Sequence, residues 1–138
     1  MHPSVCNILI IDDDIHIVKL IGLNLTSSQF RISYAKNGQQ AIHSIKNNNY
    51  DLILVDLMMP DIDGLSLIKS VKADLPANTL IILLTAHVLE QYLMEAVQGG
   101  VHDIIQKPFT ANRLKLTIRN AWNYKKLLDK RQDQDRTK

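Results

Sequence analysis

The sequence lacks three features that would each indicate a particular class of protein. Its single cysteine, Cys6, cannot form an internal disulfide, which excludes a disulfide-stabilised scaffold and favours a reducing compartment such as the cytoplasm. No apolar run approaches the ~18–20 residues that a membrane-spanning helix needs. There is no internal repeat and no low-complexity stretch. The chain is therefore predicted to form an ordinary globular domain, in which Cys6 is a small core residue at the start of a strand.

The composition fits this interpretation, and the charge is distributed unevenly. The 138 residues suffice for one domain with a real core, and 46% hydrophobic with 22% charged residues is ordinary for a globular chain. Residues 1–109 carry 7 Lys and Arg against 11 Asp and Glu, a net charge of −4. Residues 110–138 carry 9 basic against 3 acidic residues, a net charge of +6. A basic C-terminal segment thus follows an acidic body.

Short apolar segments alternate with segments of helical periodicity five times along the chain. Strands are predicted at residues 5–11, 30–35, 51–55, 80–84 and 101–106, and helices at residues 14–27, 39–48, 65–74, 88–98 and 110–130. Several of the strands are apolar throughout, as in a parallel sheet that is covered by helices on both faces. The pattern predicts an α/β fold, but it does not give the order of the strands.

Some positions carry more local predictions. Asp14 and Thr110 are expected to cap the first and last helices, because their side-chain oxygens can accept hydrogen bonds from free backbone N–H groups. Ile15, Val18, Ile21 or Gly22, and Leu25 have the spacing of an inward-facing stripe on the first helix. The first helix is therefore expected to bury one face against the sheet.

Polar side chains follow four of the predicted strands. Asp12 and Asp13 follow the first, Asp56 the third, Thr85 the fourth and Lys107 the fifth. Because the carboxyl ends of parallel strands meet at one edge of a sheet, these side chains are expected to converge. Three carboxylates close together repel one another and raise the pKa of at least one of them. A hard divalent cation such as Mg²⁺ relieves that repulsion.

The same set of groups suits phosphoryl transfer. A carboxylate neutralised by Mg²⁺ and by Lys107 can attack a phosphoryl donor, while the metal and the lysine stabilise charge on the transferring oxygens. A mixed anhydride on Asp56 would stay open to water, so the modification would be transient. The sequence therefore predicts a phosphorylation switch, not a bulk-turnover enzyme.

Four motifs in order resemble the receiver domain of two-component response regulators over about residues 5–125. They are the acidic pair 12–13, the string DLMMPDIDG at 56–64, Thr85-Ala86 and Lys107-Pro108-Phe109. The resemblance implies a flavodoxin-like, doubly wound parallel sheet of order 2-1-3-4-5 with five helices, the last of them extended. It implies a receiver domain at 1–125, a helix extension or linker at 126–138, and a cytoplasmic location.

The resemblance also assigns roles at the acidic site. Asp56 corresponds to the phosphoacceptor and to one metal ligand. Asp13 corresponds to a direct Mg²⁺ ligand, and Asp12 to a ligand that acts through water. The backbone carbonyl of Met58 would be a third protein ligand.

Further roles concern the response to phosphorylation. Thr85, in the Thr85-Ala86 step, would hydrogen-bond the phosphoryl group, and Lys107 would pair with it, preceding a cis peptide bond at Pro108. Receivers commonly have an aromatic residue three positions before the lysine, but here the residue is Ile104. An aliphatic side chain presents no ring face or hydroxyl, which puts the usual threonine–aromatic coupling in doubt as the output route.

The resemblance implies a histidine kinase or phosphotransfer protein as the phosphoryl donor. Output to a domain or partner would use the face made by the fourth helix, fifth strand and last helix. The last helix itself has a 4-3-4-3 rhythm, like a short coiled-coil seam, at Leu114, Ile118, Ala121, Lys125 and Leu128. The first half of this helix is expected to cover the sheet. A homodimer seam, a signalling linker and a solvated end all remain open for its second half. Its basic charge comes without a base-reading module, so nucleic-acid binding is not indicated.

Two other functions were considered from the residues. Ile104 favours a receiver-fold interaction module that is not phosphorylated physiologically, whereas the intact acidic set opposes it. The Asp12-x-Asp14 spacing resembles the nucleophile loop of haloacid-dehalogenase-like phosphatases. However, His16 stands where that loop has threonine or valine, and Asp103 is the single late acidic residue of the domain.

Overall fold

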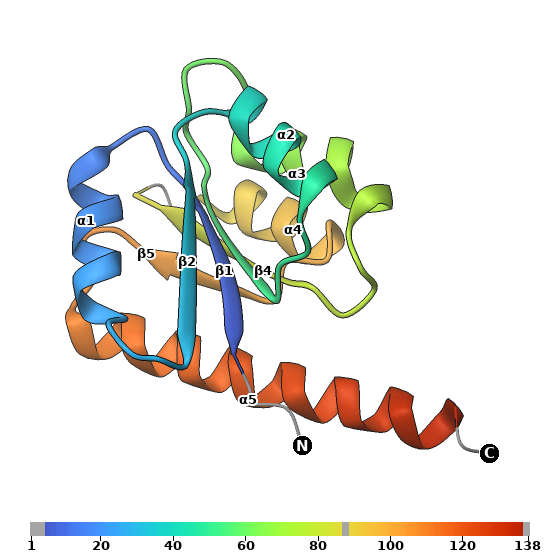
Figure 1. Cartoon of the computed structure of the whole chain (residues 1–138). Helices are drawn as coiled ribbons and strands as arrows, with labels where there is room; N and C mark the ends of the chain where they lie inside the picture. The colour runs from blue at the N-terminus through green and yellow to red at the C-terminus, as the bar shows by residue number, and fades with distance from the viewer. Residues whose placement is uncertain (1–4, 87–88, 137–138) are drawn as a thin grey trace.

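The computed structural model describes residues 5–86 and 89–136 of the 138. Strands and helices alternate within these residues (Figure 1): β1 Cys6–Ile11, α1 Ile15–Asn24, β2 Phe30–Ala35, α2 Gly38–Asn47, β3 Leu52–Asp56, α3 Gly64–Val71 with a 3₁₀ turn η1 at Lys72–Asp74, β4 Leu80–Thr85, α4 Glu90–Gln98, β5 Asp103–Gln106 and α5 Ala111–Arg136. None of the described helices combines the length and the apolar character that crossing a membrane requires. His87, considered from the sequence as a residue at the mouth of the site, and Val88, the predicted start of the fourth helix, lie outside the described residues.

The five strands form one sheet of order β2-β1-β3-β4-β5, and every neighbouring pair is parallel. This confirms the doubly wound, flavodoxin-like fold. The order reverses direction between β1 and β3, so the carboxyl ends of these two strands flank the switch point at which such sheets bind ligands. Ile11 pairs with Val55, and the residues that follow them are therefore brought to the same edge of the sheet.

Two apolar layers cover the sheet, one on each face. Because side chains alternate along a strand, Leu9 and Ile11 face the layer under α2, α3 and α4, whereas Ile8 and Ile10 face the layer under α1 and α5 (Figure 1). Cys6 is fully buried in the second layer, as predicted. The central strands are therefore apolar on both sides, which explains their continuous apolar runs.

The predicted helix caps are confirmed, and one predicted core position is wrong. Asp14 accepts a hydrogen bond from the backbone N–H of His16 at 2.9 Å, and Thr110 accepts one from that of Arg113 at 3.0 Å. Ile15 is 43% exposed, because it is the first residue of α1 and the buried stripe begins one turn later. The predicted positions Ile21 and Leu25 are buried, which confirms the rest of the stripe and selects Ile21 over Gly22.

Helix α5 is longer than predicted and packs differently from the coiled-coil interpretation. It continues to Arg136, and the 4-3-4-3 row faces its own domain. The first four residues of that row are buried and the last packs against the same apolar layer: Leu114, Ile118, Ala121, Lys125 and Leu128. The row is therefore part of the core of this domain, so a dimer would have to use another face of α5.

A buried ion pair explains how a lysine fits in that row. Lys125 is 7% exposed and lies 3.2 Å from Asp51 and 2.7 Å from Asp129. Asn78 donates a further hydrogen bond to Asp129 at 3.1 Å. The helix is therefore packed against the rest of the domain as far as Asp129. The predicted boundary between the receiver domain and the extension at residue 125 stays a prediction.

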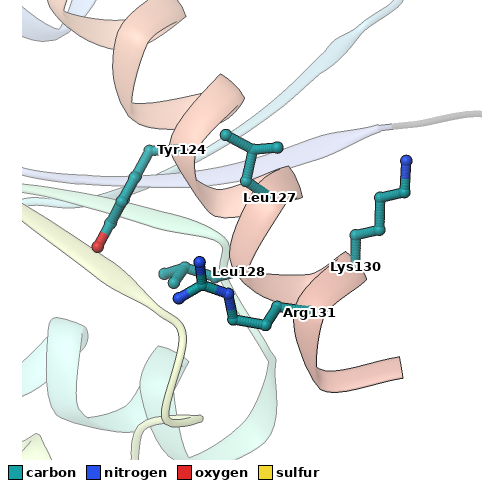
Figure 2. Close-up of a pocket in the computed structure, with 5 residues that line it drawn as sticks. All are labelled: Tyr124, Leu127, Leu128, Lys130 and Arg131. Atoms are coloured by element: carbon teal, nitrogen blue, oxygen red, sulfur yellow. The ribbon is translucent and has the colours of Figure 1, made fainter. Parts of the chain in front are cut away.

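The two aromatic residues of α5 differ in exposure. Trp122 is buried, whereas Tyr124 is exposed and stacks on the ring of His102, with 5.1 Å between ring centroids. Figure 2 shows Tyr124 and Arg131 extending to the same side of the helix, where they line a surface hollow with Leu127, Leu128 and Lys130. The walls of this hollow come from one helix.

Candidate functional site

Three carboxylates converge at the carboxyl ends of β1 and β3. Asp12, Asp13 and Asp56 each place one carboxylate oxygen within 4.8 Å of the others. Asp12 and Asp56 are buried, whereas Asp13 is exposed. The convergence predicted from the strand ends is therefore confirmed, and it creates a partly open acidic site.

Lys107 enters this site from the end of β5. Its Nζ lies 2.8 Å from Oδ2 of Asp12 and 3.4 Å from Oδ1 of Asp56. Its backbone N–H donates to the carbonyl of Thr85 at 2.8 Å, which fixes the end of β5 beside β4. The Lys107–Pro108 peptide bond is cis, as expected. One cation thus bridges two of the three carboxylates.

Burial and crowding change the protonation behaviour of the site. The pKa of Asp56 is raised, first because burial penalises its charged form and then because Asp12 is close. Burial lowers the pKa of Lys107, but its hydrogen bond and ion pair with Asp12 outweigh that effect, so the pKa is raised overall. The pKa of one carboxylate is thus raised, as predicted, but burial of Asp56 contributes more to the rise than the repulsion on which the prediction rested. A bound cation would offset both effects.

The turn after Asp56 is folded closely against it. The backbone N–H of Met58 lies 3.4 Å from Oδ1 of Asp56, while the Met58 side chain is exposed. Met59 packs against the apolar layer under α2, α3 and α4, as predicted. The Gly64 N–H donates to the Leu57 carbonyl at 2.8 Å, which closes the turn at the start of α3.

Two acidic residues of this turn cap helices and do not join the site. Asp63 caps α3 by accepting hydrogen bonds from the N–H and hydroxyl of Ser66 at 2.9 and 2.7 Å. Asp61 reaches across to α2 and accepts from the N–H groups of Gly38 and Gln39 at 3.1 and 3.2 Å. These bonds, first that from Gly38, lower the pKa of Asp61. Sequence reasoning placed Asp61 in a turn and missed its role at α2.

The remaining site candidates lie as the strand ends predict. Thr85 is buried at the end of β4 and Ala86 is exposed directly after it. Ile104 is partly buried and packs against the layer that contains α4. Tyr34, at the end of β2, is a neighbour of the site that the sequence did not indicate. Burial, and then the charges of Asp12, Asp13 and Asp14, raise its pKa.

Asp14 is separate from the acidic cluster. Its side chain caps α1 and is exposed, while the backbone N–H of Asp14 donates to Oδ1 of Asp12 at 2.9 Å. A phosphatase of the haloacid dehalogenase type would use both of these aspartates in catalysis. Here Asp12 is engaged with Lys107, so the geometry gives no support to that alternative.

Comparison with known proteins gives consistent results. The model of the response regulator receiver domain matches residues 8–119. The transcriptional regulatory protein SrrA of Staphylococcus aureus is 37% identical over 112 residues, which cover 81% of this chain and 46% of that protein. The chain therefore spans about half the length of the curated relatives that it matches.

Two solved structures extend the comparison. The receiver domain of the Francisella response regulator 1452 is 30% identical, with a TM-score of 0.77 over 86% of this chain and 98% of that one. The signal receiver domain of a putative Luxo repressor protein from Vibrio parahaemolyticus is 26% identical, with a TM-score of 0.84 over 91% and 95% of the two chains. With the acidic site at the sheet edge, these matches show that the chain belongs to the response regulator receiver family, the phosphoaccepting regulatory switches of two-component systems.

Proposed function

We propose that Asp56 is the residue that accepts the phosphoryl group, and that the donor is a histidine kinase or a phosphotransfer protein. The observation that carries this proposal is the position of Asp56 between Lys107 and the carboxylates of Asp12 and Asp13. Of the three, Asp56 is the one at the end of the central strand β3, and the turn that follows it is closed by Gly64. Receiver domains partner with histidine kinases. That such a kinase or a phosphotransfer protein is the donor to this chain is part of the proposal.

The residues of this site fit Mg²⁺. Three carboxylates and one lysine leave a formal charge of −2, which one divalent cation neutralises. Oxygen ligands of this kind, few in number and partly open to water, are those that Mg²⁺ prefers. Asp13 and Asp56 would hold the ion directly, Asp12 would hold it through water, and the Met58 carbonyl would complete the protein ligands. The bound ion would neutralise charge on the transferring phosphoryl oxygens.

The side chains of the chain itself perform the transfer. A carboxylate oxygen of Asp56 attacks phosphorus, an oxygen–phosphorus bond forms, and the phosphorus–nitrogen bond of the donor phosphohistidine breaks. The electron pair of that bond returns to the donor imidazole, which takes up a proton. Lys107 orients the attacking carboxylate and then pairs with the transferred group, while Thr85 and Ala86 lie beside it at the end of β4. Water later cleaves the acyl phosphate.

Output is proposed to use the face formed by α4, β5 and α5, toward an output domain or a partner. Ile104 lies on this face and is partly buried. Its side chain is aliphatic, so this position has no aromatic ring. We infer that the signal starts when Thr85 binds the phosphoryl group and reaches this face without the inward movement of an aromatic ring, since position 104 carries isoleucine. A homodimer that uses another side of α5, and a cytoplasmic location, stay predictions.

The direct test is intact-mass analysis after incubation with acetyl phosphate and Mg²⁺. Wild-type chain is expected to gain one phosphoryl group, and Asp56→Asn none. Asp14→Asn is the matched control, because Asp14 is a nearby aspartate that caps a helix, and it should still be labelled. Labelling of Asp56→Asn to the same extent as wild type would contradict the assignment.

The same experiment addresses the interaction-module alternative. If folded, Mg²⁺-binding wild type gained no phosphoryl group from acetyl phosphate or from a phosphorylated histidine phosphotransfer protein, that alternative would replace the proposal. The complete set of Asp12, Asp56 and Lys107 favours labelling.

A further inference from the structure

A second cavity, the α1–α5 hollow, lies at the opposite end of the sheet from the acidic site. It is formed by three elements: the end of α1 at Leu25, the start of β2 at Phe30, and α5 at Trp122. In Figure 1 the connection from α1 to β2 passes close to α5. The volume of the hollow is about 190 Å³. These three residues give it an apolar lining that the phosphorylation site does not use.

The charged residues that line the hollow are all cations. Lys115 and Arg119 stand one turn apart on the same side of α5, and no acidic residue is among the lining residues. Within residues 5–86 and 89–136, neither side chain forms an ion pair. Two like charges four residues apart destabilise a helix, and an anion placed between them removes that cost.

Polar groups lie around the Trp122 ring that lines the hollow. The Nζ of Lys126 lies 5.4 Å from the centroid of the Trp122 ring, which adds a third cation beside the indole. The indole N–H of Trp122 is buried and has no acceptor among the described residues. This nitrogen is covered by neighbouring atoms, so it serves as a reporter on the Trp122 ring and not as a donor to a ligand. The amide side chains of Asn24, Gln29 and Asn123 complete the lining.

We propose that the α1–α5 hollow binds a small organic anion with an apolar body, of the class of aromatic carboxylates. The apolar lining suits a ring, and the planar guanidinium of Arg119 suits a carboxylate, which it can bind through two parallel hydrogen bonds. The hollow is smaller than the roughly 300–1,000 Å³ occupied by drug-sized ligands, which excludes a nucleotide. This site is separate from Asp56 and does not depend on phosphorylation.

The experiment uses Trp122, the only tryptophan of the chain, whose indole N–H gives a single signal in a ¹H–¹⁵N spectrum. The full chain is titrated with sodium benzoate at constant ionic strength. A ligand of this size is expected to produce a saturable shift with a Kd of about 1 mM. Benzamide has the same ring without the charge. Its Kd, measured from the same signal, should be about tenfold higher.

Two variants separate this site from general attraction to a basic helix. Arg119→Gln combined with Lys115→Gln should weaken benzoate binding about tenfold or more, since both cations are removed. Lys130→Gln combined with Arg131→Gln removes the same charge from another part of α5 and should leave it unchanged. All four side chains are exposed, so both double variants are expected to fold.

Several results would overturn the proposal: no saturable shift, equal responses to benzoate and benzamide, or equal loss of binding in the two double variants. Saturable binding of the peptide acetyl-Asp-Phe-Asp-amide without any response to benzoate would assign the hollow to a protein partner and would also overturn it. Asp56→Asn should bind benzoate as wild type does, so failure here is distinguishable from failure of the phosphoacceptor assignment.

Discussion

Gly64 lies so close to Asp56 that a methyl group at position 64 would overlap the backbone carbonyl oxygen of Asp56. The backbone of Gly64 does not adopt a positive φ, so glycine is needed for space and not for conformation. Its N–H also donates to the carbonyl of Leu57 at 2.8 Å. The start of α3 therefore fixes the backbone that carries the proposed phosphoacceptor.

The first prediction concerns this contact. Gly64→Ala should lower the free energy of unfolding by about 2 kcal/mol, because the added methyl group meets backbone atoms that cannot rotate away. It should also slow labelling by acetyl phosphate, since Asp56 would be displaced. Urea denaturation and intact-mass kinetics measure the two effects.

Gly22→Ala is the matched control for Gly64→Ala. Gly22 lies inside α1, and a methyl group there meets no atom within 4 Å. Alanine in a helix interior is favoured over glycine, so this variant should gain about 0.5–1 kcal/mol. Equal stability of the two variants would show that the contact at Gly64 is unimportant.

The second prediction concerns Lys107 and the metal. Lys107→Ala should bind Mg²⁺ about tenfold more tightly than wild type, because a cation that competes for Asp12 and Asp56 has been removed. The same variant should be labelled more slowly, as it lacks the partner of the transferred group. Titration calorimetry measures the affinity, with Lys46→Ala on α2 as the control. Weaker Mg²⁺ binding by Lys107→Ala would contradict the proposed arrangement.

The acidic site was predictable because its geometry follows from strand ends. Runs of apolar residues locate β1 and β3, and a parallel sheet brings Asp12 and Asp56 to one edge. The hydrogen bond from Gly38 to Asp61 was not predictable, because it joins the first residue of α2 to the loop before α3, 23 residues away in the sequence. No local pattern encodes that contact.

The prediction for α5 is confirmed in its first half, where Leu114, Ile118 and Ala121 cover the sheet, whereas the row in its second half also packs on the same domain. A 4-3-4-3 rhythm describes one apolar side of a helix, whether that side meets a second chain or its own sheet. Lys125 is the one charged member of the row, and it is buried beside Asp51, a residue 74 positions away. The periodicity therefore identified the contact side, and the tertiary structure decided what covers it.

The third prediction tests this ion pair. Lys125→Ala removes the packed lysine stem and leaves the partly exposed carboxylates of Asp51 and Asp129 without their cation, which should cost about 2 kcal/mol of stability. It should also increase amide hydrogen exchange in the part of α5 after Asp129. Lys126→Ala, which removes a cation stacked over Trp122, should cost less than about 1 kcal/mol. Equal losses for the two lysines would show that Lys125 contributes no more than a surface charge.

The fourth prediction concerns Thr117 on the buried side of α5. Its hydroxyl is buried and has no hydrogen-bond partner among the described residues. Thr117→Val has the same shape without the unpaired hydroxyl and should raise the free energy of unfolding by about 1 kcal/mol. Thr117→Ser keeps the hydroxyl and loses a methyl group, so it should be less stable than wild type. Urea denaturation of the three chains checks both signs, and a destabilised valine variant would indicate a hidden partner.

The fifth prediction concerns pH and the hydrogen bonds that Asp61 accepts at the start of α2. Its pKa in the folded chain is below the ordinary value, because the N–H groups of Gly38 and Gln39 stabilise the carboxylate. The unfolded chain therefore binds the proton more readily. The contribution of Asp61 to stability is complete above its unfolded pKa of about 4 and is lost as the pH falls through the folded value.

Asp61→Asn should consequently be less stable than wild type at pH 7, and the difference should shrink as the pH falls below about 4. Urea midpoints measured between pH 7 and pH 2.5 follow this convergence. Glu95→Gln removes one negative charge from an exposed position on α4, away from α2, and is the matched control for net charge. If Asp61→Asn and Glu95→Gln had the same pH profile, the effect would be one of overall charge, and the hydrogen bonds from Gly38 and Gln39 would not be its cause.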